Sequence, residues 1–240
     1  MSVTSKPLVV LKEDFVTYFK LKKVKVLYDR GDTLVWETVS TSDASVRRAV
    51  KHIRSIDSDG RAINRRVIAT ELAALRQVNH PHIVETFAAA YCRGYVAYSM
   101  PMYPRGSLAR MRGKIDQDML ERCFVQVACA VRYLHKRNIV HGDIKPENIM
   151  IDDSNNAILS DFGLAQFLFK GNTTVSEWGG TEGYIGPEVY RQKQYNACLV
   201  SKITPTSATK ATTRKNNNHK IQPTTKTKNT VYNNKSTQMK

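Results

Sequence analysis

Two short segments in the middle of the chain gather side chains that could act together on a phosphate. The first, HGDIKPENIM, carries Asp143, Lys145 and Asn148, and the second, SDFGLA, carries Asp161. Phosphoryl transfer from a nucleotide needs a carboxylate to orient the acceptor hydroxyl and cationic charge near the phosphates. Asp143 suits the first role and Lys145 the second. Asn148 and Asp161 offer oxygen ligands of the kind that magnesium takes. The two segments therefore predict metal-assisted phosphoryl transfer.

The pattern of apolar residues predicts the elements that must position these segments. Apolar residues at three- and four-residue steps predict a helix over 62–78 and a long amphipathic helix over 117–136, with Phe124 and Val127 on its apolar face. A β-rich part followed by a helical part, joined by the linker PMYPRGS, indicates an α+β fold of two lobes. β-branched and alternating stretches predict strands at 24–28, 33–39, 47–54, 83–91, 95–100, 149–151 and 157–159.

Taken together, the motifs are similar to those of the eukaryotic-type protein kinases. The loop HGDIKPEN, the triplet DFG and the segment GGTEGYIGPE follow one another in that family's order, and the resemblance covers about residues 24–190. A lone DFG triplet is most often just a turn, but the set in order leaves little room for chance. Lys145 and Thr181 resemble the Ser/Thr branch of the family. The resemblance implies a protein substrate, with ATP and magnesium as cofactors.

The resemblance also implies where the nucleotide would bind. Lys51 in RRAVKHI is similar to the strand lysine that contacts the α- and β-phosphates, and Glu71 is similar to its partner on the following helix. The other contacts implied for the nucleotide, including the linker carbonyl and amide that would bind adenine, are Gly31, Ala49, Met100, Pro101, Tyr103 and Met150.

The chain departs from the family's pattern in its phosphate loop and its catalytic loop. Of three expected glycines, DRGDTL keeps only Gly31, which predicts weaker binding of ATP. Trp36 falls where a small valine normally lies over adenine, unless a one-residue shift brings Val35 there. Gly142 replaces an arginine, so a phosphate on the segment 173–176 would lack its usual guanidinium partner.

The motifs and the composition together predict three parts. The larger lobe is expected to be incomplete, because a polar stretch follows Tyr195 where the family has a buried helix, and a partner protein could complete it. The predicted parts are an N-terminal extension at 1–20, a kinase domain at 21–200 with a small lobe at about 21–100 and a partial larger lobe at about 104–200, and a disordered basic tail at 201–240.

Charge and composition narrow the class of protein. The net charge is +16, and nine Lys or Arg with no Asp or Glu lie in the tail 201–240. Such a tail could contact acidic surfaces, although a simply solvated tail is the commoner case. No apolar run reaches the roughly 20 residues of a membrane span. The four cysteines form no CxxC pair, which favours an intracellular, cytoplasmic or nuclear location.

Two other functions remain open at this point. Small-molecule phosphotransferases also carry an HGD triplet, but they typically lack the KPEN spacing and the GTxxYxxPE segment found here. A catalytically dead pseudokinase, acting as a binding module or decoy, would explain the lost glycines. The retained polar set of Lys51, Glu71, Asp143, Asn148 and Asp161 favours an active enzyme.

Overall fold

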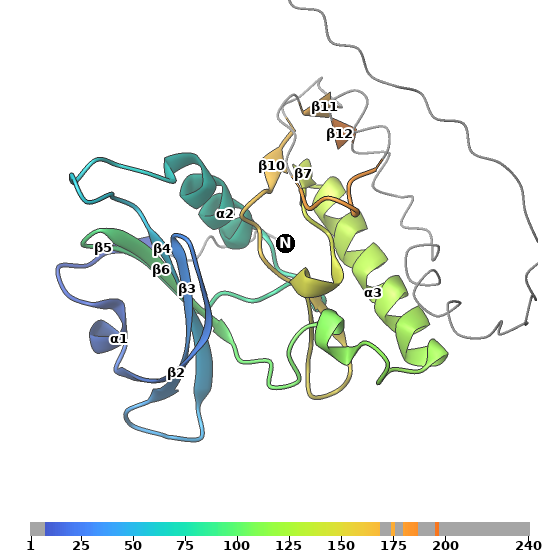
Figure 1. The fold of residues 1–240 in the computed structure, drawn as a ribbon, viewed down its shortest axis with the longest axis horizontal. Helices are drawn as coiled ribbons and strands as arrows, with labels where there is room; N and C mark the ends of the chain where they lie inside the picture. Colours follow the sequence, from blue (N-terminus) through green and yellow to red (C-terminus); the bar gives the residue numbers. More distant parts are fainter. Residues whose placement is uncertain (1–7, 169–173, 176–179, 187–194, 197–240) are drawn as a thin grey trace, which may run out of the picture. The chain divides into compact units, whose positions relative to one another are not determined.

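A six-stranded sheet forms the first part of the chain. The computed structural model describes residues 8–168, 174–175, 180–186 and 195–196, which all belong to the unit Met1–Lys202. The sheet has the order β1-β5-β6-β4-β3-β2, and its neighbours are antiparallel except for β1 with β5 (Figure 1). Its strands are β1 (Leu8–Val10), β2 (Leu21–Arg30), β3 (Thr33–Ser40), β4 (Arg47–Arg54), β5 (Ala88–Cys92) and β6 (Tyr95–Pro101).

The predicted strands of this sheet are confirmed, and their bounds differ most at β5. The expected strand began at residue 83, whereas β5 begins at Ala88. Ile83 forms a bridge with Leu159 instead, and the Val84 amide donates to the Leu159 carbonyl at 2.9 Å. The start of the predicted strand therefore pairs with a later strand, which sequence pattern alone does not distinguish.

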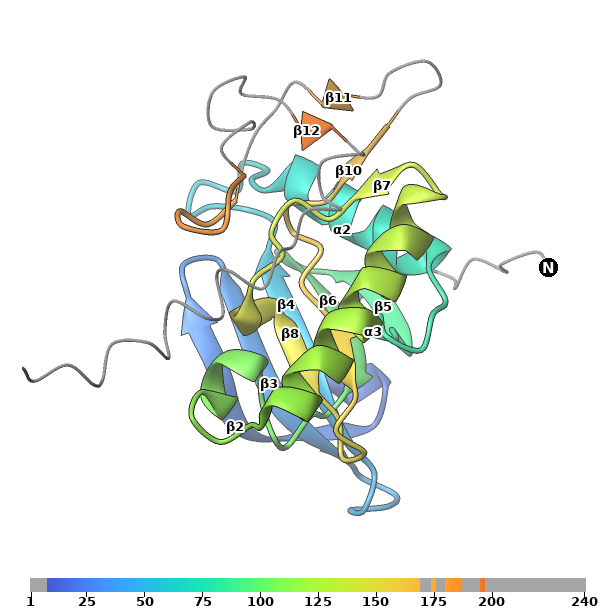
Figure 2. The same ribbon diagram turned by 90° about the vertical axis from the view of Figure 1, so that its right-hand side faces the viewer.

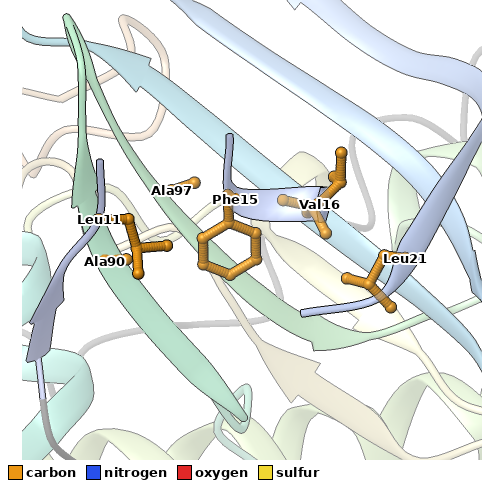
Figure 3. Packing of buried hydrophobic residues seen from close by; sticks show 7 residues of the cluster. Leu11, Phe15, Val16, Leu21, Ala90 and Ala97 are labelled. Atoms are coloured by element: carbon orange, nitrogen blue, oxygen red, sulfur yellow. The ribbon is translucent and has the colours of Figure 1, made fainter. Parts of the chain in front are cut away.

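One face of the sheet packs against the N-terminal segment. Phe15, in the short helix α1 (Phe15–Tyr18), is fully buried in a cluster with Val50 of β4 and Ala97 of β6 (Figure 3). The segment predicted as an extension thus contributes β1 and α1 to the core of the sheet, from residue 8 onward.

The opposite face of the sheet carries helix α2 (Arg65–Gln77) (Figure 1). Ile68, Leu72 and Leu75 of this helix are buried at helical spacing, as predicted. The helix begins three residues later than expected, because Asn64 takes a left-handed φ of 54°. The side-chain Nδ2 of Asn64 donates to the Arg54 carbonyl at 3.0 Å and so joins the start of α2 to the end of β4.

Helix α3 (Gln117–His135) supports the second part of the chain (Figure 2). Asp116 caps its N-terminus, because the Asp116 carboxylate accepts a hydrogen bond from the Met119 amide at 2.7 Å. The expected helix is confirmed, but the placement of Phe124 on its buried face is wrong, since this side chain is 39% exposed. The stripe that the helix buries instead consists of Met119, Cys123, Val127, Ala130, Val131 and Leu134.

Short strands beside α3 flank the two segments that carry Asp143 and Asp161. The predicted pair β8 (Ile149–Ile151) and β9 (Ala157–Leu159) is confirmed as an antiparallel hairpin. Gln126 of α3 accepts a hydrogen bond from the Ala157 amide at 2.8 Å, which ties the helix to β9. The remaining elements are η1 (Leu108–Met111), β7 (Ile139–Val140), η2 (Pro146–Asn148), β10 (Gln166–Phe167), β11 (Thr174–Val175) and β12 (Tyr195–Asn196).

Two predictions about the end of the chain lie outside the described residues. These are the incomplete larger lobe beyond Tyr195 and the disordered basic tail at 201–240. Within the described part, no helix combines the length and the apolar character that a membrane crossing requires.

Candidate active site

A buried lysine joins the sheet to two carboxylates. Lys51 of β4 is 7% exposed, and its Nζ donates to Glu71 Oε1 at 2.7 Å and to Asp161 Oδ1 at 2.8 Å. Burial alone would lower the pKa of Lys51, but the negative charges of Glu71 and Asp161 outweigh it and raise the pKa well above its usual value. The ammonium is therefore charged at neutral pH and held between α2 and the DFG segment.

The catalytic-type loop holds its aspartate from three sides. Lys145 Nζ lies 2.7 Å from Asp143 Oδ2, and Asn148 Nδ2 donates to the same oxygen at 2.9 Å. Thr181 Oγ1 donates to Asp143 Oδ1 at 2.8 Å and accepts from Lys145 at 2.6 Å. Burial raises the pKa of Asp143, but these hydrogen bonds outweigh it, so the pKa is lowered and the carboxylate is ionised.

Thr181 is a member of this network that the sequence did not place there. Its motif indicated only the branch of the family. The contact joins residues 38 positions apart, so only the folded path of the chain brings the hydroxyl to Asp143. The GGTEGY motif could have indicated this role, because it places a hydroxyl side chain a set number of residues after the DFG triplet.

A buried histidine and phenylalanine support the loop from beneath. The rings of His141 and Phe162 lie 4.8 Å apart, and both side chains are almost fully buried. His141 Nδ1 accepts from the Asp143 amide at 3.3 Å, while Nε2 faces the Ser160 carbonyl at 3.0 Å. Burial lowers the pKa of His141, so the ring is neutral. His141 therefore packs against Phe162 beneath the loop.

Two backbone positions in the site are left-handed. Asp161 has a φ of +62°, which is rare for a residue with a side chain and turns its carboxylate toward Lys51. Gly142 has a φ of +82°, and a Cβ at this position would overlap the carbonyl oxygen of Leu164. The local backbone therefore requires glycine where the family has arginine.

Several residues expected at the nucleotide lie along the face of the sheet that carries Lys51. Ala49 of β4 pairs directly with Met100 of β6, and Lys51 pairs with Tyr98. Pro101 ends β6, and Tyr103 follows it, half-buried. Because alternate residues of a strand share a face, Ala49, Lys51 and Met100 lie on one side of the sheet.

Met150 and Gly31 occupy two other places in the fold. Met150 lies in β8 and forms a bridge with Ser107, the last residue of the linker. Gly31 lies at the tip of the β2–β3 hairpin, with a φ of +58° in a two-residue turn between the paired Arg30 and Thr33. The hairpin stays paired to its tip, so it is a tight turn and not an open glycine-rich loop.

The register of β3 decides which residue faces the nucleotide side. Val35 pairs with Lys51 and Glu37 pairs with Ala49, whereas Trp36 pairs with Val50 on the opposite face. The interpretation that placed Trp36 over adenine is therefore wrong, because neighbouring residues of a strand point to opposite faces. Glu37 occupies the position opposite Ala49 instead.

Glu37 is a buried carboxylate that the sequence pattern did not single out. It is 1% exposed and forms ion pairs with Arg47 and, at 3.7 Å, with Lys25. An acidic residue in the middle of TLVWETVS was its only signal. This places a paired charge beside Ala49 on the face where adenine is expected.

The residues expected to hold magnesium have suitable chemistry. Burial raises the pKa of Asp161, but the positive charge of Lys51 outweighs this effect, so the pKa is lowered. The side chain of Asp161 is 49% exposed. The side-chain nitrogen of Asn148 donates hydrogen bonds to Asp143, so the side-chain oxygen of Asn148 is the atom left for a metal. Both are oxygen donors, which magnesium prefers. No cluster of three or more His, Cys, Asp or Glu able to hold a metal occurs among the residues that the structure describes.

Comparison with known proteins agrees with this geometry. Residues 34–201 match the model of the protein kinase domain, which is more than half of the chain. The match begins just after the β2–β3 turn that contains Gly31.

Individual relatives are distant and longer. CBL-interacting serine/threonine-protein kinase 12 of Arabidopsis thaliana is 31% identical over 137 residues, which are 55% of this chain and 28% of that protein. CBL-interacting protein kinase 19 of Oryza sativa subsp. japonica is 33% identical over 133 residues, 54% of this chain and 26% of that protein. The carbon catabolite-derepressing protein kinase of Candida tropicalis is 32% identical over 130 residues, 53% of this chain and 21% of that protein.

The matched segment thus spans about a quarter of the length of these relatives. The match to the domain model, which covers residues 34–201, is the broader finding. It includes every residue placed in the networks around Lys51 and Asp143. On this match the chain belongs to the protein kinase domain family.

Proposed function

We propose that this chain is an ATP-dependent protein kinase that transfers the γ-phosphate to Ser and Thr hydroxyls of protein substrates. The observation that carries the proposal is the double contact of Lys51, at 2.7 Å from Glu71 and 2.8 Å from Asp161. A lysine held in this way presents a fixed positive charge to the phosphates, and it ties the sheet to the segment that would hold the metal.

Asp143 is the residue that would act on the acceptor hydroxyl. Its lowered pKa keeps the carboxylate ionised, so it can accept a hydrogen bond from a Ser or Thr hydroxyl and orient that oxygen. Lys145 lies 2.7 Å from this carboxylate and would offset negative charge on the transferring phosphoryl group. Thr181 fixes the geometry of both side chains.

Asp161 and Asn148 would hold the magnesium ion through their side-chain oxygens. Bound there, the ion would neutralise charge on the β- and γ-phosphates. The half-exposed carboxylate of Asp161 would serve the ion, while its other oxygen keeps Lys51 in place. For the base, Ala49, Met100 and Met150 would line the adenine, with the Pro101 carbonyl and the Tyr103 amide as its hydrogen-bonding partners.

The choice of an active enzyme over a pseudokinase rests on the completeness of the network. A binding module needs no ionised Asp143 with three partners, and it needs no lysine between two carboxylates. The choice of Ser/Thr hydroxyls follows Lys145 and Thr181, and one of the relatives above is named as a serine/threonine-protein kinase. We place the protein inside the cell, where ATP is available.

A transfer assay with two matched variants tests the proposal. Radiolabelled γ-phosphate of ATP is offered to a generic basic protein, and the wild-type chain is compared with Asp143→Asn and Asp161→Asn. We expect label from the wild type and at least a hundredfold less from either variant, about 2.7 kcal/mol of barrier. Binding of ATP, followed by thermal stabilisation, should survive in Asp143→Asn. Equal labelling by all three proteins would contradict the proposal.

A further inference from the structure

The Lys51–Glu71 pair has a third member, Tyr98. Tyr98 lies directly opposite Lys51 in the β4–β6 ladder and is 2% exposed. Its hydroxyl donates to Glu71 Oε1 at 2.6 Å, which is the same oxygen that accepts from Lys51 Nζ at 2.7 Å. Two donors from neighbouring strands therefore converge on one oxygen of a helix residue.

The other oxygen of Glu71 has no hydrogen bond within the described part of the chain. Glu71 is fully buried, and its Oε2 is buried without a partner there. The hydrogen bonds described for this carboxylate thus come only from Lys51 and Tyr98. A buried carboxylate that loses one of two donors is left poorly compensated and free to turn.

Tyr98 touches both members of the pair. Lys51 Nζ lies 5.8 Å from the centre of the Tyr98 ring, on a side chain that reaches toward the same helix. Tyr98 belongs to β6 and Glu71 to α2, so the hydroxyl bond joins the sheet to the helix. Glu71 itself raises the pKa of Tyr98 beyond the effect of burial, which keeps the phenol protonated as the donor.

We propose that Tyr98 is a positioning residue, whose hydroxyl holds Glu71 and α2 where Glu71 meets Lys51. This inference rests on the proposed kinase function. The arrangement needs no phosphate on the chain, in keeping with Gly142, which offers no guanidinium to receive one. The hydrogen bond of Tyr98 keeps the lysine aligned in the unmodified protein.

A pair of tyrosine variants separates positioning from stability. Tyr98→Phe removes the hydroxyl but keeps the ring beside Lys51. Tyr95→Phe is the matched control, because the Tyr95 hydroxyl donates to Asp14 at 2.6 Å on the other face of the same sheet. We expect kcat/KM for ATP to fall at least tenfold in Tyr98→Phe, with the KM for the protein substrate unchanged. Tyr95→Phe should keep kcat/KM for ATP within twofold of the wild type.

A double-mutant cycle with Glu71→Gln shows whether Tyr98 acts through Glu71. If it does, Tyr98→Phe should lower kcat/KM for ATP by less than twofold when Glu71 is already Gln. All variants are assayed below their measured melting temperatures, so that the fraction folded does not enter the rates. The combined loss of the tyrosine and Glu71 changes should therefore be far smaller than the product of the two single losses.

The outcomes distinguish the inference from the function on which it rests. An active wild type with Tyr98→Phe equal to Tyr95→Phe would overturn the inference alone. It would also be overturned if the losses in kcat/KM for ATP from Tyr98→Phe and Glu71→Gln multiply in the double variant. Tyr98 would then act independently of Glu71. A wild type that neither binds ATP nor transfers phosphate would overturn the proposed function together with the inference.

Discussion

Thr181 donates a hydrogen bond to Asp143 at 2.8 Å and accepts one from Lys145 at 2.6 Å. A single hydroxyl therefore bridges the carboxylate and the ammonium of the catalytic-type loop. This bridge fixes the carboxylate at the same time as it holds the ammonium beside it. The segment that carries Thr181 would therefore take part directly in the geometry of the proposed catalytic site.

The hydroxyl of Thr181 should be required for turnover but not for ATP binding. Thr181→Val keeps the shape and removes the bridge, so we expect kcat to fall at least tenfold, about 1.4 kcal/mol of barrier, with KM for ATP unchanged. Thr181→Ser keeps the hydroxyl and should restore most of kcat. Steady-state kinetics of the three proteins provide the measurement. Equal kcat in Thr181→Val and the wild type would show that the bridge has no part in transfer.

A side chain at position 142 should destabilise the protein. Gly142→Ala meets both a left-handed φ and the Leu164 carbonyl, so we expect a loss of about 3 kcal/mol of unfolding free energy. Gly60→Ala is the control, because Gly60 has a similar φ of +77° with nothing within 4 Å of a Cβ. It should cost about 1 kcal/mol. Urea unfolding of both variants is the measurement, and equal losses would contradict the close approach to Leu164.

Acid should weaken the packing of the N-terminal segment through His52. Its ring stacks on Tyr95 at 4.8 Å, and burial, helped by Lys23 and opposed by Asp14, lowers the pKa of His52 from 6.5 to about 4. As the pH falls, His52 takes up a proton in the unfolded chain near pH 6.5 and in the folded chain only near pH 4. Its contribution to stability is therefore complete above pH 6.5 and is lost as the pH drops toward 4. Protonation of His52 should lower the free energy of unfolding by about 3 kcal/mol over this range.

The variant His52→Phe tests this pH dependence. It keeps a stacking ring but cannot titrate, so its free energy of unfolding should fall less than that of the wild type between pH 6.5 and 4. Urea unfolding at steps of pH measures the difference. Parallel curves for the two proteins would show that His52 is not the group responsible, leaving other histidines such as His141.

Replacing Glu37 should improve the use of ATP. Its carboxylate lies opposite Ala49, so Glu37→Val removes a negative charge near the expected base and phosphates. We expect KM for ATP to fall severalfold while kcat stays the same. Trp36→Val, on the other face of the same strand, should leave KM for ATP unchanged. The register is contradicted if Trp36→Val changes KM and Glu37→Val does not.

The sequence predicted local features well because local features depend on few contacts. Asp143 and Asn148 are five residues apart, and their hydrogen bond forms within one loop. The hairpin of β8 and β9 spans a short turn, so its strands could be read from the pattern alone. The contact of Lys51 with Glu71 joins two elements, and only the resemblance to a family predicted it.

Features that depend on register were not predictable in the same way. Whether Trp36 or Glu37 faces the nucleotide side depends on a pairing offset of one residue, and such a slip exchanges the two faces of a strand. The role of Tyr98 needs the β4–β6 register and the position of α2 together. Phe124 was misplaced because two apolar stripes on α3 competed, and only packing decides which one is buried.

Phosphate mapping on a protein substrate tests whether this chain transfers phosphate to Ser and Thr hydroxyls. A basic protein is incubated with magnesium, ATP and either the wild-type chain or Asp143→Asn, and the modified residues are identified by mass spectrometry. We expect phosphoserine and phosphothreonine with the wild type, none above background with Asp143→Asn, and none when a chelator removes magnesium. Phosphorylation that is equal with both proteins, or that is absent with the wild type, would contradict the proposed function.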